Sequence, residues 1–248
     1  MGKQTGLIQL EGSVGNVTFY KGPDGAIAKI KAGPSKSKLQ TSPTFEKLRQ
    51  QNSEFGRAGL ASRLFKKVFR TMIKGNSDNR VSRRLHKKMV EVIQADLINP
   101  RGKRNVVDGE AELLKGFEFN KDKSLDAAFA VEFTSAIDRV TGEMKVHINS
   151  FIPANDVLAP AGTTHYRIFI GSASIDFEKE EFVTDFKSTD DLPWDKVATA
   201  AIDLVTTVTP NSTHPLFLLM GIQYCDIVNG SKTLSNLGSL SVVMVSGE

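Results

Sequence analysis

The cysteine, the histidines and the acidic clusters are the residues of this chain whose types could carry out chemistry. Cys225 is the only cysteine among 248 residues, so neither a disulfide within the chain nor a thiolate cluster for zinc or iron–sulfur is expected. The four histidines lack the short spacings typical of metal ligands: His86, His147, His165 and His214. We therefore expect no metal ion, no cofactor and no catalytic residues, and we predict that the protein is not an enzyme.

Acidic side chains gather in two segments, which are Glu178, Glu180, Glu181 and Asp185, and then Asp190, Asp191 and Asp195. A solvated rim is the favoured interpretation, with a calcium site as the alternative. The sequence contains no nucleophile elbow, phosphate-binding loop, dinucleotide fingerprint, zinc-protease motif or EF-hand loop. A catalytic pair of carboxylates could still meet in the fold, but no spacing points to one.

Basic residues form the one group that suggests a partner. Nine of those assigned to a basic helical face fall between positions 63 and 88 and three more follow in a short segment: Arg63, Lys66, Lys67, Arg70, Arg80, Arg83, Arg84, Lys87, Lys88, Arg101, Lys103 and Arg104. Such a stripe could follow the phosphates of a nucleic acid. The segment offers no interleaved exposed aromatic residues and no known nucleic-acid module, so a solvated or self-contacting face is favoured.

Charge is divided unevenly along the chain. Residues 1–110 contain 22 Lys and Arg against 9 Asp and Glu, a net charge of +13, whereas residues 111–248 contain 10 against 19, a net charge of −9. The sum is the overall charge of +4. This asymmetry suggests either an anionic partner for the basic half or head-to-tail contact between copies.

The elements that position these residues differ between the two halves. Residues 7–31 are predicted to form a small antiparallel β unit, in which Val14, Val17, Phe19 and Tyr20 are the candidate contact residues. An isolated hairpin is marginal in water, so this arm must dock on something. Residues 33–40 are rich in lysine and serine and are predicted to be a linker, which completes an N-terminal part at residues 1–40.

A basic helical hairpin is predicted within residues 41–110. Ser42 followed by Pro43 is a helix-start signal, and the apolar periodicity predicts one helix over 43–74 and a second over about 79–98. In both helices the basic residues lie opposite the apolar face. The second helix is predicted to stop at Asn99-Pro100.

Strand patterns fill the acidic part, residues 111–248. The candidates are residues 117–120, 130–138, 143–150, 165–177, 181–187, 196–208, 216–228 and 239–245. Seven or eight strands with turn signals between them predict an antiparallel β-sandwich. The predicted fold class is therefore α+β: a β-hairpin arm, a basic helical hairpin and a β-sandwich.

Hydropathy gives no sign of a membrane span or a secretory signal. The longest apolar run, residues 215–222, is far shorter than the roughly 18 residues that a spanning helix needs. A cytoplasmic location is therefore the default expectation, with export by a non-classical route left open.

Several stretches resemble an uncharacterised family of bacterial proteins, mostly from Bacteroidetes. They are residues 12–21 (GSVGNVTFYK), 54–59 (EFGRAG), 101–106 (RGKRNV) and 160–166 (PAGTTHY). The resemblance spans nearly the whole chain and implies a bacterial source. It carries no activity and no site residues across.

The sequence thus favours a self-assembling structural protein, a subunit of a filament, tube or shell that associates head-to-tail with copies of itself. A nucleic-acid-binding protein of nucleoid or phage-like type, using the basic helical face, is the alternative. A ligand-binding sandwich is third. Assembly symmetry, cargo and strand order do not follow from the sequence.

Overall fold

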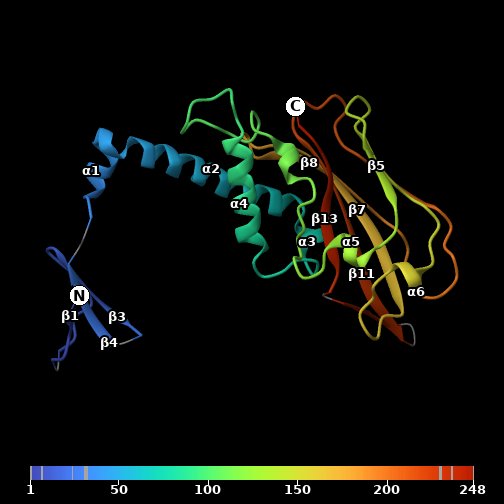
Figure 1. The fold of residues 1–248 in the computed structure, drawn as a ribbon, viewed down its shortest axis with the longest axis horizontal. Helices are drawn as coiled ribbons and strands as arrows, with labels where there is room; N and C mark the ends of the chain where they lie inside the picture. Colours follow the sequence, from blue (N-terminus) through green and yellow to red (C-terminus); the bar gives the residue numbers. More distant parts are fainter. Residues whose placement is uncertain are drawn as a thin grey trace. The chain divides into compact units, whose positions relative to one another are not determined.

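A computed structural model describes residues 2–6, 8–23, 25–30, 33–228, 231–235 and 237–247 (Figure 1). The chain forms two compact units, residues 1–49 and residues 50–248. Helices and antiparallel sheets are both present, and the predicted α+β class is confirmed.

A four-stranded antiparallel sheet, in the order β1-β4-β3-β2, occupies the first unit. Its strands are β1 Gly2–Lys3, β2 Gly12–Val14, β3 Val17–Gly22 and β4 Gly25–Ile30. The predicted β unit is therefore present, with β1 as an additional edge strand. Leu7, Asp24 and Lys31 of the predicted span lie outside the described residues.

The segment 33–40, predicted to be a linker, contains most of a short helix, α1 Lys36–Thr41. The hydroxyl of Ser35 accepts the main-chain N–H of Lys38 at 3.2 Å and so caps the helix start. The predicted linker therefore contains a short capped helix. The lysine-rich composition gave no sign that the Ser35 side chain caps the first helical turn.

Three helices and one 3₁₀ turn follow where one long helix and a second helix were predicted. They are η1 Pro43–Phe45, α2 Glu46–Val68, α3 Arg70–Ile73 and α4 Val81–Gln94. The break falls at Phe69, whose φ of −97° and ψ of 22° depart from helical values. Ser42 precedes the 3₁₀ turn, but its side chain makes no capping hydrogen bond.

The second unit is built around a six-stranded antiparallel sheet. Its strands are β7 His165–Asp176, β8 Glu181–Ser188, β9 Leu192–Pro193, β11 Leu216–Val228, β12 Ser231–Leu234 and β13 Ser239–Ser246. The long central strands β7 and β11 pair with each other, and β8 forms one edge beside β7. On its other side, β11 pairs with β13 over residues 216–222 and with β12 over residues 225–228.

A three-stranded sheet packs on one face of this large sheet. Its order is β10-β6-β5, with β5 Phe133–Ile137, β6 Glu143–Ile148 and β10 Ile202–Thr207. Met144, Val146 and Leu204 from the small sheet share a buried cluster with Ile168 and Leu218 from the large one. Two sheets packed face to face form the predicted sandwich. The short helices α5 Leu125–Ala128 and α6 Pro153–Asp156 and the 3₁₀ turn η2 Ala111–Leu114 lie in its connections.

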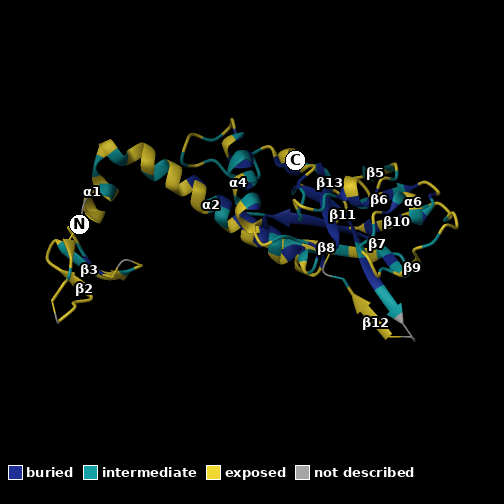
Figure 2. Cartoon of the chain, turned by 60° about the horizontal axis from the view of Figure 1, so that its bottom comes forward, coloured by how far each residue is buried: buried dark blue, intermediate teal, exposed yellow. Residues whose placement is uncertain are grey.

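The helices cover the opposite face of the large sheet. The ring of Phe65 on α2 lies 5.0 Å from the ring of Phe217 on β11, edge to face, and both are fully buried. Because β7 and β11 are covered on both faces, they are buried along most of their length, as Figure 2 shows in dark blue. One core therefore joins residues on both sides of position 110.

Close packing on this helix-covered face depends on a glycine. Gly221 lies in the middle of β11, and a Cβ atom there would be 2.5 Å from the ring of Phe169 and 2.6 Å from the carbonyl oxygen of Ser239. The Phe169 ring therefore occupies the space that a side chain at position 221 would need.

Candidate interaction surfaces

The sheet of the first unit has one apolar face. Directly opposed residues of antiparallel strands project from the same face, and the register pairs Val17 with Val14 on one side and Ile30 on the other. Phe19 and its partner Ala28 lie two residues further along and project from that face too. We call Val14, Val17, Phe19, Ala28 and Ile30 the arm face.

The arm face is not covered by a core of its own unit. Val14 is 68% exposed and Ile30 is 70% exposed, whereas Val17, Phe19 and Ala28 are partly buried. Among the described residues of 1–49, only Ala26 and Ile27 are buried (Figure 2). The sheet therefore has a strand ladder but almost no interior.

Three of the four predicted contact residues of the arm belong to the arm face, and the fourth does not. Tyr20 pairs with Ile27, which places it on the opposite face. Two lysines also divide between the faces: Lys21 continues the arm face beyond Phe19, whereas Lys29 projects from the Tyr20 side.

Arg84, one of the predicted basic residues, holds structure together. Its guanidinium donates to the carboxylate of Asp78 and to the carbonyl oxygens of Glu118, at 2.6 Å, and Phe119, at 3.0 Å. Burial by itself raises the pKa of the Asp78 carboxyl, but hydrogen bonds from main-chain N–H groups and from Arg84 outweigh it and leave the pKa lowered. Three lysines of the set are also engaged: Lys66 with Ser82, Lys67 with the ring of Phe182, and Lys88 with Glu91.

Other predicted basic residues converge at the start of α4. Arg80, Arg83 and Lys87 line a hollow of about 560 Å³ together with Lys121. None of these four side chains has a hydrogen-bonding or ionic partner among the residues that the structure describes. The positive end of the helix dipole adds to their field, whereas the carboxylates of Asp78 and Asp122, which line the same hollow, oppose it. Arg63 and Arg70 are exposed elsewhere on the helices.

Two stretches that carry the family resemblance meet in the structure. The N–H of Gly102 donates to the carboxylate of buried Glu54 at 2.6 Å. The guanidinium of Arg57 donates to the carbonyl oxygens of Gly102 and Arg104, each at 2.8 Å. The predicted basic loop is thus fixed against α2, while the side chains of Arg101 and Lys103 remain exposed.

Asp96 organises the loop that follows α4, and sequence analysis did not single it out. Its fully buried carboxylate accepts the N–H groups of Ile98, Asn99 and Asn105 and the side-chain amide of Asn99, at 2.8–3.1 Å. Burial raises the pKa of this carboxyl, but these hydrogen bonds outweigh burial and lower the pKa. The loop displays Leu97 and Ile98, which are 91% and 77% exposed. The signal available in the sequence was an aspartate three residues before Asn99-Pro100.

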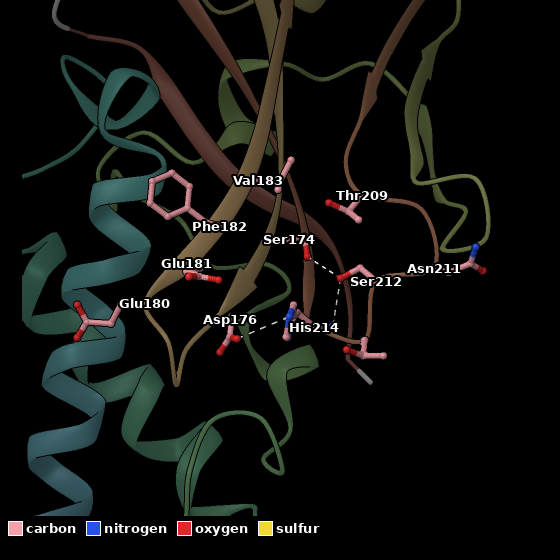
Figure 3. A pocket seen from close by; sticks show the side chains of 11 residues that line it. Ser174, Asp176, Glu180, Glu181, Phe182, Val183, Thr209, Asn211, Ser212 and His214 are labelled. Carbon is pink, nitrogen blue, oxygen red and sulfur yellow. Dashed lines mark hydrogen bonds and ion pairs between the residues drawn. The ribbon is translucent and has the colours of Figure 1, made fainter.

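A cleft of about 670 Å³ opens between the start of β8 and the segment that follows β10 (Figure 3). The hydroxyls of Ser174 and Ser212 are 2.7 Å apart at its floor, and the Ser212 hydroxyl also accepts the main-chain N–H of His214. The full lining is Ser174, Asp176, Glu180, Glu181, Phe182, Val183, Thr209, Asn211, Ser212, Thr213 and His214.

Asp176 gathers near Ser212 and His214 in this cleft, but the three do not form a nucleophile relay. One carboxylate oxygen of Asp176 accepts the N–H groups of Glu178 and Lys179, and the other lies 3.7 Å from Nε2 of His214. The hydrogen bond from Lys179 lowers the pKa of the Asp176 carboxyl, against the effect of burial. Among the described residues, no hydrogen bond joins the His214 ring to a serine hydroxyl.

The rim of the cleft carries two acidic side chains that sequence analysis assigned to a solvated rim. Glu180 and Glu181 form no ion pair or side-chain hydrogen bond with any described residue. Glu180 has a φ of 58°, in the left-handed region that non-glycine residues rarely adopt, and Asn211 across the cleft has a φ of 50°.

The described part of the chain holds no group of three or more His, Cys, Asp or Glu side chains placed to bind a metal ion. Within the same residues, no helix combines the length and the apolar composition that a membrane crossing requires. Comparisons with known protein families, with curated proteins and with solved structures found no match. The surfaces described above are therefore the basis for assigning a function.

Proposed function

We propose that the protein is a self-assembling structural subunit whose N-terminal unit docks on a second copy. The observation that carries this proposal is the arm face, an apolar side of a four-stranded sheet that its own unit leaves without a core. A sheet needs a second layer to bury its apolar side, and a sheet this small gains little stability alone. A neighbouring copy supplies the missing layer.

Charge supports a second copy as the partner. Residues 1–110 carry a net charge of +13 and residues 111–248 a net charge of −9, so opposite parts of two copies attract. A contact between two different surfaces of the same protein is heterologous and produces rings or open filaments. Such assembly is the role of a filament, tube or shell subunit.

The experiment compares the full chain with a variant that lacks residues 1–40. Sedimentation velocity and negative-stain electron microscopy should find assemblies for the full chain and a folded monomer for the truncated one. A matched pair of point variants localises the effect: Val17→Asp lies on the arm face, whereas Thr18→Asp adds the same charge on the opposite face. Assembly by the truncated protein equal to that of the full chain contradicts the proposal.

A second candidate function is nucleic-acid binding, favoured by the unpartnered cations around the hollow at the start of α4. We expect no tight binding, because no exposed aromatic residue lines this hollow for base stacking. Fluorescence anisotropy with single- and double-stranded DNA across a salt series tests this. Nanomolar binding at physiological salt that Arg83→Glu/Lys87→Glu abolishes and Arg63→Glu/Arg70→Glu preserves would favour this candidate over assembly.

A further inference from the structure

β8 is an edge strand of the large sheet, and some of its outward-pointing main-chain groups border the cleft. The Thr189 N–H donates to the Ile168 carbonyl oxygen. Because hydrogen-bonded and non-hydrogen-bonded pairs alternate along an antiparallel ladder, the main-chain groups of Phe182 and Thr184 then point away from β7. Further along β8, the Asp185 carboxylate closes the edge by accepting the N–H of Phe186 at 2.8 Å and that of Thr207 on β10 at 2.9 Å. Phe182 and Thr184 therefore keep outward-pointing main-chain groups at the end of β8 that borders the cleft.

The open part of the edge combines an apolar and an acidic character. Val183 is 47% exposed and lines the cleft together with the unpaired carboxylates of Glu180 and Glu181, of which Glu180 points away from Val183 (Figure 3). No lysine or arginine is among the residues that line it. Such a surface matches a partner that brings apolar side chains followed by a positive charge.

The arm face has this character. Val17, Phe19 and Lys21 alternate along β3 and project from one face, so two apolar side chains are followed by a lysine. The Lys21 side chain is exposed and has no hydrogen-bonding or ionic partner among the described residues. Exposed lysines elsewhere in the sheet, such as Lys29, project from the other face.

We infer that the cleft beside β8 receives the arm face of a second copy, with Lys21 at Glu180 and Glu181 and with Phe19 against Val183. This inference rests on the proposed function and names the docking site. An exposed ion pair contributes little, so apolar burial holds the contact and the charges set its orientation. Over Val17–Phe19, β3 is paired with β2 on one side and with β4 on the other, so the contact is made by its side chains.

A charge-swap series in the full-length protein tests the pairing. Lys21→Glu should raise the apparent dissociation constant of assembly about tenfold, because a favourable pair becomes a like-charge contact. Glu180→Lys/Glu181→Lys should act in the same direction, and the variant with all three substitutions should return to within about threefold of the parent. The control is Lys29→Glu, which makes the same charge change on the opposite face and should shift the constant by less than about threefold.

Zero-length cross-linking shows whether the contact joins two copies. An equal mixture of ¹⁴N- and ¹⁵N-labelled protein is treated with a carbodiimide, and mass spectrometry should find Lys21 joined to Glu180 or Glu181, with about half of the cross-links carrying one peptide of each label. Cross-links confined to single labels would mean that each chain fills its own cleft, which overturns the inference.

The two proposals fail in different ways. If removal of residues 1–40 abolishes assembly while Lys21→Glu and Lys29→Glu behave alike, the arm is the connector but the cleft is not its site. If removal of residues 1–40 leaves assembly unchanged, both proposals fall. Unchanged thermal unfolding of each variant is required before its assembly is compared, and Lys21→Glu replaces an exposed side chain.

Discussion

The large unit, residues 50–248, and the small unit, residues 1–49, both contain antiparallel sheets, but only the large unit has a core. In the large unit, helices cover one face of the six-stranded sheet and a second sheet covers the other. In the small unit, four strands leave all but Ala26 and Ile27 of the described residues at least partly accessible. A strand ladder alone therefore does not make a stable unit; a second apolar layer does.

The largest expected effect is the loss of a ring from the core of the large unit. Phe65 is fully buried, and its ring lies 4.9 Å from that of Phe69 and 5.0 Å from that of Phe217. Phe65→Ala should lower the free energy of unfolding by about 3–5 kcal/mol, measured by urea denaturation. The control, Phe55→Ala on the same helix, removes a ring that is 59% exposed and should cost less than about 1 kcal/mol. Similar losses for both would mean that α2 does not seal this core.

Asp96→Asn should have the next largest effect, on the order of 3 kcal/mol, because buried donors lose a charged acceptor. The folded-state pKa of this carboxyl is lowered, so its stabilising contribution is present above the unfolded pKa of about 4 and is lost as pH falls through the folded value. In unfolding free energies measured from pH 7 to pH 3, the difference between parent and variant should therefore begin to shrink below about pH 4. A gap that stays constant with pH would contradict this assignment.

Gly221→Ala tests how closely the large unit is packed. It should lower the free energy of unfolding by about 1–3 kcal/mol, because the new methyl group meets the Phe169 ring and the Ser239 carbonyl. A matched glycine gives the opposite sign. Gly56 lies in α2 with no atom within 4 Å of a Cβ placed there, so Gly56→Ala should stabilise the helix by about 0.5–1 kcal/mol. Equal effects at the two positions, by urea denaturation, would remove the steric explanation.

The smallest expected effect is in the small unit. Ile30→Ser on the arm face should change the free energy of unfolding of dilute, monomeric protein by less than about 0.5 kcal/mol, because Ile30 is 70% exposed. The same substitution should raise the concentration at which assembly begins, followed by light scattering. If the free energy of unfolding of the monomer fell by more than about 1 kcal/mol, Ile30 would belong to a core inside the small unit.

The long strands of the large unit could be read closely from the sequence, whereas the predicted strand at 117–120 is only an isolated bridge at Glu118 and the one at 196–208 is strand only over β10. The predicted strand at residues 216–228 coincides with β11, and those at 165–177 and 181–187 each differ by one residue from β7 and β8. Long apolar runs bounded by turn residues predict strands well when both faces are buried. The helix break at Phe69 could not be predicted, because the apolar periodicity continues through it.

The candidate surfaces divide in the same way between local and tertiary information. β-Forming residues between glycines along residues 12–20 were enough to locate the arm, although the opposite placement of Tyr20 depends on its pairing with Ile27. The cluster of basic residues was evident from composition. The sequence did not show which of these residues hold structure together and which have no partner, because Arg84 donates hydrogen bonds to carbonyl groups more than 30 residues away. The cleft joins segments separated by about 30 residues and left no contiguous motif.

The contact between Phe65 and Phe217 imposes an order of events on synthesis. The two rings belong to positions 65 and 217, so α2 leaves the ribosome well before the strand that covers its apolar side exists. At about 5–20 residues per second, the interval is roughly 8–30 seconds. During that time the apolar stripe of a nascent helix is exposed in the crowded surroundings of the ribosome, together with the uncovered arm face. A chaperone that shields both segments until residue 217 emerges would raise the yield of folded protein, and slow codons placed before β11 would lower it.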